Sequence, residues 1–271
     1  MNLLQEKLTK LNELLLNMGS AAIAFSGGVD SSFLAAAASR VLGDKAIAVT
    51  AYSATLAERE KKEAVAIAAK IGIKHVLLPI SELDSADFIA NTAKRCYYCK
   101  KERFSVLSQW AQEQGIAWVL EGSNADDVSD YRPGMQAINE LEKVKSPLLE
   151  VGITKEEIRA LSKQWQLPTW NKLSAACLSS RVQYGMKITA EKLHQVEQAE
   201  EFVRGFCSGQ VRVRHHGNLA RIEVSAQDIA GIAREDNAAK ITGFIKQLGF
   251  TYVTLDLAGY RTGSMNEVLA K

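Results

Sequence analysis

Two adjacent glycines near the start of the chain separate a short apolar run from a stretch with helical character. The apolar run covers residues 21–25, and the hexapeptide over 26–31 (SGGVDS) leads into a helical stretch over 30–42 that stops at Gly43. Glycine permits backbone angles that a Cβ would forbid, so main-chain N–H groups can approach a phosphate. The N-terminus of the following helix adds further donors and a partial positive charge. This feature therefore predicts a strand, a phosphate-binding loop and a helix, in that order.

The same alternation of short apolar runs and helical stretches continues beyond this loop. Strand-like runs cover 46–51, 74–80 and 116–120, and helical stretches cover 57–71 and 100–114. Thr154 and Glu157 have the spacing of a capping box that opens another helix. Short strands alternating with helices of about a dozen residues indicate an α/β fold, in which a parallel sheet carries helices on both faces.

The pattern changes beyond Gly185, where strands and helices no longer alternate regularly. The elements expected there are a helix over 190–204, strands around 210–214 and 219–224, helical segments between 226 and 248, and a strand over 251–257. We therefore predict two domains, an α/β domain over 1–183 that contains the phosphate-binding loop and a smaller α+β domain over 184–271.

The composition is typical of a soluble globular protein, with 47% hydrophobic and 24% charged residues. The net charge of +2 is spread evenly along the chain, which disfavours a nucleic-acid partner. Charged residues interrupt the Leu-rich N-terminal stretch, and no apolar run approaches the roughly 20 residues that a membrane helix needs. We therefore expect a cytoplasmic protein with no membrane or nucleic-acid partner, whose four cysteines are thiols or ligands.

The hexapeptide is not one of the common nucleotide loops, because the chain lacks both G-x-x-x-x-G-K-[ST] and G-x-G-x-x-G. Ser26 and Ser31 can donate hydroxyl hydrogen bonds to a phosphate. Asp30 is an anomalous neighbour for a phosphate unless Mg²⁺ lies between them, so we interpret it as a carboxylate on the metal side. The alternative is a glycine-rich turn in which Asp30 caps the helix.

The hexapeptide resembles the pyrophosphate loop of the N-type ATP pyrophosphatases, which cleave ATP between the α- and β-phosphates and leave adenylated intermediates. Asn124, Asp126 and Asp127 follow the strand expected to end at Leu120 and resemble the second acidic motif of that superfamily; the alternative is a solvated turn. The resemblance implies a PP-loop fold that binds ATP and Mg²⁺. The residues expected at this site are Ser26, Gly27, Gly28, Asp30, Ser31, Ser53, Gly122 and Asp126.

Three cysteines form a second candidate site. Cys96 and Cys99 form a C-x-x-C pair, and Cys177 follows much later in the chain. A zinc site would want four ligands, and only Cys207 remains, in the other predicted domain. A thioredoxin-like redox pair would want the C-x-x-C at the start of a helix, and three thiolates could also hold an iron–sulfur cluster with one open iron. The spacing alone leaves these alternatives open.

A wider set of motifs is similar to one family. The motifs are Asp130-Tyr-Arg-Pro-Gly134, Trp170-Asn-Lys172, Ala176-Cys-Leu-Ser-Ser-Arg-Val-Gln-Tyr-Gly185, Val211-Arg-Val-Arg214 and Leu255-Asp-Leu-Ala-Gly-Tyr-Arg-Thr-Gly263. Together they resemble the LarE family, ATP-dependent sulfurtransferases that make the pyridinium bis-thiocarboxylate precursor of the nickel-pincer nucleotide cofactor. The resemblance covers essentially the whole chain. It implies that a carboxylate of pyridinium-3,5-biscarboxylic acid mononucleotide attacks the α-phosphorus of ATP, and that a sulfur nucleophile then displaces AMP.

The family resemblance offers two sources for the sulfur. In one branch a single cysteine, which Cys177 matches, donates its own sulfur and becomes dehydroalanine. In a second branch three cysteines hold a [4Fe–4S] cluster whose open iron carries an extra sulfide, and Cys96 and Cys99 match that branch. We predict the cluster rather than the sacrifice of Cys177, since three thiolates with one open corner suit a carrier. Cys207 is expected to be a small buried residue.

The resemblance also implies an anion site for the phosphate and carboxylates of the substrate. The matching positions are Ser180, Arg181, Arg212, Arg214 and Arg261. The residues expected to take part in catalysis are Cys177, Asp30 and Glu200. The alternative for Arg212 and Arg214 is one exposed face of a strand, because they alternate with two valines.

The expected partners are the small pyridinium mononucleotide, further copies of the chain in a homo-oligomer, and the nickel-insertion or upstream carboxylase enzymes. Two rival interpretations remain. A tRNA-thiolating ATP pyrophosphatase can also use a three-cysteine cluster, but it should show a basic face, which the even charge balance disfavours. A nucleotide-sensing module with a structural zinc would not be an enzyme, and metal analysis would identify it.

Overall fold

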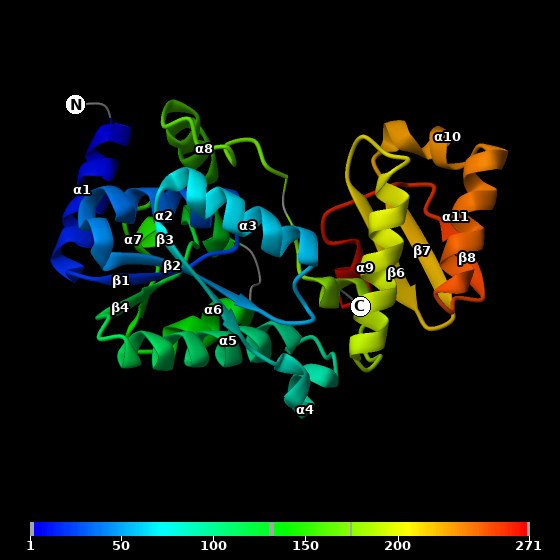
Figure 1. The fold of residues 1–271 in the computed structure, drawn as a ribbon, viewed down its shortest axis with the longest axis horizontal. Coiled ribbons are helices and arrows are strands. Elements are labelled where there is room, and N and C mark those ends of the chain that lie inside the picture. Colours follow the sequence, from blue (N-terminus) through cyan, green and yellow to red (C-terminus); the bar gives the residue numbers. More distant parts are fainter. Residues whose placement is uncertain (1–2, 130–132, 174, 270–271) are drawn as a thin grey trace. The chain divides into compact units, whose positions relative to one another are not determined.

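The computed structural model describes residues 3–129, 133–173 and 175–269. The chain forms two compact units, which are drawn in Figure 1. The first unit comprises Met1–Glu82 and Cys96–Ala175, and the second comprises Leu83–Arg95 and Ala176–Lys271. Residues 130–132 of the Asp130–Gly134 motif lie outside the described residues. The domain boundary expected at residue 183 stays a prediction.

The first unit is built on a five-stranded parallel sheet, which confirms the predicted α/β class. The strand order is β3-β2-β1-β4-β5. The strands are β1 (Ala21–Ala24), β2 (Ala46–Tyr52), β3 (Lys74–Pro79), β4 (Trp118–Leu120) and β5 (Val144–Lys145). The helices of this unit are α1 (Leu3–Met18), α2 (Val29–Leu42), α3 (Glu58–Ile71), α5 (Arg95–Glu113), α6 (Pro133–Asn139), α7 (Pro147–Glu150) and α8 (Lys155–Gln164).

Helices cover both faces of this sheet. Helices α1, α2 and α3 pack on one face, and α5 and α6 pack on the other (Figure 1). Along β1, Ala21 and Ile23 join the first core while Ala22 joins the second, as the alternation of side chains in a strand requires. A strand buried on both faces reads as a continuous apolar run, which is why this segment was recognisable in the sequence.

The strand order reverses next to β1. The chain passes from β1 outward to β2 and β3, and then returns to β4 and β5 on the other side. In open α/β sheets, ligands bind outside the carboxyl ends of the strands at such a switch point. The loops that follow β1 and β4, starting at Phe25 and Glu121, therefore occupy the position where a ligand site is expected.

Helix α5 starts earlier than the sequence pattern predicts. It begins at Arg95 rather than near Lys100, so Cys96 and Cys99 lie within its first two turns. No glycine or proline interrupts the Cys-Tyr-Tyr-Cys run, and these residues are tolerated in a helix. The capping box was predicted correctly: Thr154 Oγ1 accepts a hydrogen bond from Glu157 N, and Glu157 accepts one from Thr154 N.

The second unit has a three-stranded sheet in the order β6-β7-β8, with β6 antiparallel and β8 parallel to β7. Its strands are β6 (Val211–His216), β7 (Leu219–Val224) and β8 (Tyr252–Leu255). Its helices are α4 (Ala86–Ile89), α9 (Ala190–Arg204), α10 (Ile229–Ile232) and α11 (Glu235–Gln247), with a short 3₁₀ turn, η4, over Leu178–Arg181. Across the described ranges, no helix has both the length and the apolar character needed to cross a membrane.

Candidate functional site

The loop between β1 and α2 is shaped by its close approach to helix α3. Gly27 has φ of 66°, in the left-handed region that favours glycine. A Cβ added there would lie 3.1 Å from the Cα of Ala64 in α3, so a larger residue would require backbone movement. Ser26 Oγ accepts a hydrogen bond from Gly28 N at 3.3 Å and lies 3.1 Å from Ser31 Oγ. The loop therefore directs backbone N–H groups and two hydroxyls around the start of α2.

The loop after β4 closes on the same place. A Cβ added to Gly122 would lie 3.3 Å from the backbone nitrogen of Ser31, so glycine lets the two loops touch. Asn124 Nδ2 donates to Asp30 Oδ1 at 3.3 Å. The side chains of Asn124 and Asp127 cap this turn, because Asp127 Oδ2 accepts from Asn124 N at 3.0 Å and Asn124 Oδ1 accepts from Asp126 N at 3.0 Å. The structure thus brings the first and second motifs together at the switch point.

Two lysines that the sequence analysis did not assign to the site contact this loop. Lys155 Nζ forms an ion pair with Asp30 Oδ2, and Lys155 N donates to Asp126 Oδ2 at 2.8 Å. Lys172 Nζ donates to Gly27 O at 3.2 Å and also pairs with Glu60 and Glu63. The signals for both were present, since Lys155 lies inside the predicted capping box and Lys172 belongs to the Trp-Asn-Lys motif.

A buried carboxylate lies beside Cys99, the second of the three cysteines. Cys99 is half-buried and its Sγ donates to Glu82 Oε1 at 3.7 Å, while Cys96 is exposed. Glu82 is fully buried and forms an ion pair with Arg103 Nη2 at 2.5 Å. Burial alone raises the pKa of the Glu82 carboxyl, but the charge and hydrogen bonds of Arg103 outweigh burial and lower it. Glu82 is therefore ionised at neutral pH.

Ser53 connects this carboxylate to the end of strand β2. Its Oγ lies 2.9 Å from Thr55 Oγ1, and Thr55 Oγ1 donates to Glu82 Oε1 at 3.3 Å. Ser53 therefore stands at the carboxyl edge of the sheet, with a hydroxyl chain leading to Glu82 and onward to Cys99.

Cys177 lies in the second unit, immediately before η4. It is half-buried, and its carbonyl oxygen accepts hydrogen bonds from Ser180 Oγ at 2.8 Å and from Arg181 Nη1 at 2.9 Å. Within residues 3–129, 133–173 and 175–269, no three His, Cys, Asp or Glu side chains gather in a way that could hold a metal ion. The predicted three-cysteine set is thus divided between the two units.

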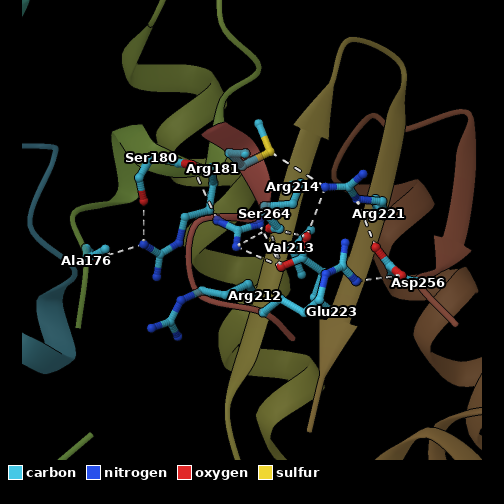
Figure 2. A network of polar contacts seen from close by, with 12 residues as sticks. Ala176, Ser180, Arg181, Arg212, Val213, Arg214, Arg221, Glu223, Asp256 and Ser264 are labelled. Atoms are coloured by element: carbon cyan, nitrogen blue, oxygen red, sulfur yellow. Dashed lines mark hydrogen bonds and ion pairs between the residues drawn. The ribbon is translucent and has the colours of Figure 1, made fainter. Parts of the chain in front are cut away.

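Strand β6 carries a buried network of ion pairs, which Figure 2 shows from close by. Arg181 Nε donates to Glu200 Oε1 at 2.8 Å, and both side chains are buried. Arg214 Nη2 donates to Glu223 Oε2 at 2.7 Å. Glu223 has no exposed surface, and it also accepts hydrogen bonds from Arg221 and Ser264.

The network continues to the C-terminal loop. Arg221 lies 3.8 Å from Asp256 Oδ2, and Arg261 lies 3.7 Å from Asp256 Oδ1 and 3.2 Å from Glu267. Ser180 O accepts a long hydrogen bond of 3.4 Å from Arg214 Nη1. Ser180, Arg181, Arg214 and Arg261, which the family resemblance singled out, are therefore joined to one polar assembly within the second unit.

Arg212 is buried, whereas the alternative interpretation placed it on an exposed strand face. Arg212 and Arg214 are each only 5% exposed, and Val211 and Val213, with which they alternate, are buried as well. The exposed-face interpretation is therefore wrong. The Arg212 guanidinium lies 5.3 Å from the centre of the Tyr260 ring. Burial, followed by the charge of Arg181, lowers the pKa of Arg212 to about 10, so the side chain still carries its charge at neutral pH.

The parallel sheet, the glycine loop at its switch point and the adjoining acidic loop define a PP-loop nucleotide-binding domain. The family model described as asparagine synthase matches residues 15–221. An uncharacterized Synechocystis protein is 42% identical over 99% of this chain and 100% of its own length, and an uncharacterized Methanocaldococcus jannaschii protein is 31% identical over 89% and 90%. The Lactiplantibacillus plantarum pyridinium-3,5-bisthiocarboxylic acid mononucleotide synthase is 36% identical over 92% of this chain and 90% of its own length. The chain belongs to the LarE family of ATP-dependent sulfurtransferases.

Proposed function

We propose that this protein inserts sulfur into pyridinium-3,5-biscarboxylic acid mononucleotide during synthesis of the nickel-pincer nucleotide cofactor. The observation that carries the proposal is the match to the Lactiplantibacillus plantarum synthase, which spans both units and includes the ATP loop and strand β6. The even charge of the chain also favours a small anionic substrate over a nucleic acid.

In the first step, a substrate carboxylate oxygen forms a bond to the α-phosphorus of ATP, and the bond to the β-phosphate breaks to release pyrophosphate. The backbone N–H groups at the start of α2, together with Ser26 and Ser31, would bind the departing phosphates. Asp30 would hold Mg²⁺, since a carboxylate is an oxygen ligand that this ion prefers. Lys155, the present partner of Asp30, would then turn toward the phosphates.

In the second step, a sulfur nucleophile attacks the adenylated carboxyl carbon and AMP leaves with the electron pair of the broken C–O bond. Adenylation is needed because a free carboxylate is a poor electrophile. We propose that Arg212, Arg214 and Arg181 hold the anionic groups of the acceptor. Arg212 supports this proposal, because a guanidinium whose pKa is lowered by burial and a neighbouring arginine is stabilised by an added anion.

We propose further that Cys96, Cys99 and Cys177 hold a [4Fe–4S] cluster. The donor chemistry fits: three thiols are present, and Cys96 and Cys99 lie one turn apart on α5, where side chains three positions apart are neighbours. The hydrogen bond that the Cys99 thiol donates to Glu82 would be given up when the thiol loses its proton to bind iron. When bound, such a cluster supplies a sulfide at the iron that lacks a protein ligand. The alternative is the sacrifice of Cys177, whose sulfur would leave and whose residue would become dehydroalanine.

Anaerobic reconstitution with iron and sulfide, followed by an ATP-dependent thiolation assay, tests the proposal. We expect several products per chain, loss of multiple turnover in Cys96→Ser and Cys99→Ser, and no loss in the matched control Cys207→Ala. One product per chain, with a mass loss of H₂S at Cys177, would establish the sacrificial route instead. Zinc without iron in the purified protein would exclude the cluster, and the absence of any thiolated product would exclude the function.

A further inference from the structure

Asn91 is a fully buried polar residue at the centre of the second unit's inserted segment, Leu83–Arg95. Its Nδ2 donates to the carbonyl oxygens of Gln183 at 2.9 Å, Met186 at 3.0 Å and Val182 at 3.3 Å. Its backbone has φ of 52°, a conformation that asparagine adopts more readily than most residues. A side-chain amide with two N–H groups facing three carbonyls is a specific requirement, because a carboxylate there would have nothing to donate.

Arg95 extends this contact to the turn that follows Cys177. It is only 4% exposed, and its Nη1 donates both to Asn91 Oδ1 at 2.9 Å and to Ser179 O at 3.1 Å. The guanidinium also lies 5.1 Å from the centre of the Tyr184 ring. Ser179 is fully buried within η4, two residues after Cys177.

Backbone bonds join the same two segments. Gly185 N donates to Asn91 O at 3.0 Å, and Ile188 N donates to Ile89 O at 3.0 Å. The segment around residue 91 is therefore fastened to the region after Cys177 by main chain and side chains together.

We propose that Asn91 and Arg95 are positioning residues for Cys177: they fix the 177–181 turn and thereby the direction of its thiol. The inference rests on the proposed function only in assigning sulfur chemistry to that thiol. Arg95 is also bonded directly to Cys96 through the chain, so the side chain that holds Ser179 belongs to the residue that starts helix α5.

The test measures how fast iodoacetamide alkylates Cys177 in metal-free protein, resolved by peptide mass spectrometry. Arg95→Ala should raise this rate about tenfold, as expected when a turn loses one or two buried hydrogen bonds and opens more often. Arg95→Lys should restore part of the protection, because one ammonium can donate to both acceptors. Arg234→Ala, which removes an exposed arginine from the same unit, is the matched control and should leave the rate unchanged.

Substitutions of Asn91 separate its side chain from its backbone. Asn91→Gly keeps the left-handed conformation and removes the amide, whereas Asn91→Asp keeps the shape but points oxygens at three carbonyls. We expect the aspartate to increase Cys177 alkylation more than the glycine. In the thiolation assay, both should lower the rate of sulfur transfer and leave the KM for ATP within about twofold, because the ATP loop belongs to the other unit.

Alkylation of Cys207 in the same digests reports whether the second unit is still folded. If Cys207 also becomes reactive in Arg95→Ala, the second unit of that variant is unfolded. The Cys177 alkylation rates of Arg95→Lys and Asn91→Gly then test the proposal in its place. Wild-type alkylation rates at Cys177 in Arg95→Ala and Asn91→Asp, with Cys207 protected, would overturn the proposal. Failure of wild-type protein to make a thiolated product would refute the function but not the positioning role, since alkylation needs neither ATP nor substrate.

Discussion

The ATP loop of the first unit and strand β6 of the second unit handle charge in opposite ways. At the loop, Asp30 and Lys155 are 25% and 37% exposed, so their ion pair is weak and easily exchanged for another partner. On β6 and β7, Arg214 and Glu223 are buried, so removing either one leaves an unpaired charge in the interior. The difference indicates that the loop is suited to binding and releasing a ligand, whereas the arginine network is a fixed arrangement.

The largest effect that tests this comparison is expected at Glu223. Glu223→Ala removes the carboxylate shared by Arg214, Arg221 and Ser264, and should destabilise the second unit by about 3–5 kcal/mol. Hydrogen exchange at the amides of β6 and β7 measures this loss. Glu267→Ala is the control, because its pair with Arg261 is exposed and should contribute little to stability. Equal hydrogen-exchange rates at the β6 and β7 amides of Glu223→Ala and Glu267→Ala would show that the buried network is not fixed.

At Asp30 we expect the opposite of Glu223, a large loss of activity with a small loss of stability. Asp30→Asn removes the charge that is proposed to hold Mg²⁺, and should lower ATP-dependent pyrophosphate release by about a hundredfold. The free energy of unfolding should change by less than about 1 kcal/mol, because the lost ion pair with Lys155 is partly exposed. Urea unfolding and a pyrophosphate assay on the same preparation measure the two quantities. A large loss of stability with unchanged pyrophosphate release would show that Asp30 stabilises the fold and does not hold Mg²⁺.

The glycine loop itself can be tested with two matched substitutions. Gly27→Ala introduces a Cβ into a left-handed residue that packs 3.1 Å from Ala64 Cα, and should cost about 1–3 kcal/mol of stability and weaken ATP binding. Gly19→Ala carries the same kind of backbone strain, with φ of 73°, but nothing lies within 4 Å of the added Cβ. Calorimetric titration with ATP should therefore detect a loss of affinity for Gly27→Ala and none for Gly19→Ala.

The first unit was largely predictable because its signals are local. The strand before Ser26 and the helix after it follow from residues that are adjacent in the chain, and the glycine loop between them is specific. Strand β5 (Val144–Lys145) was missed, because two residues are too few to show a pattern. The start of α5 was misplaced by five residues, since the helical pattern was recognised only from Lys100 onward.

The second unit was less predictable because its important contacts join distant segments. No local pattern indicates that Arg214 pairs with Glu223 on the next strand, or that both faces of β6 are covered. The attachment of Asn91 and Arg95 to residues 179–186 is invisible in the sequence, since it depends on how segment Leu83–Arg95 packs. The alternative that Arg212 and Arg214 form an exposed strand face therefore followed the usual case for charged side chains, while only the family resemblance indicated an anion site.

A smaller, pH-dependent effect is expected from His215 on β6. Burial, with the charges of Lys192 and His216, lowers the pKa of His215 to about 4. The unfolded chain binds a proton near pH 6.5, so the stability contribution is complete above that pH and is lost as the pH falls toward about 4. His215→Gln should flatten this dependence in urea unfolding, whereas the exposed His194→Gln should keep it. Identical pH profiles for wild-type protein and His215→Gln would contradict this prediction.

The smallest effect is expected at Cys207, which tests whether the fourth cysteine belongs to the sulfur chemistry. It packs at the edge of the second unit's core, and burial, with a further contribution from Asp228, raises its pKa to about 11. Little thiolate is then present at neutral pH, and a thiol without thiolate character is a poor nucleophile and a poor metal ligand. Cys207→Ala should therefore cost only about 1 kcal/mol, with unchanged iron content and turnover. Loss of iron in this variant would mean that Cys207 is a ligand, and that the fixed second unit contributes more than one thiol.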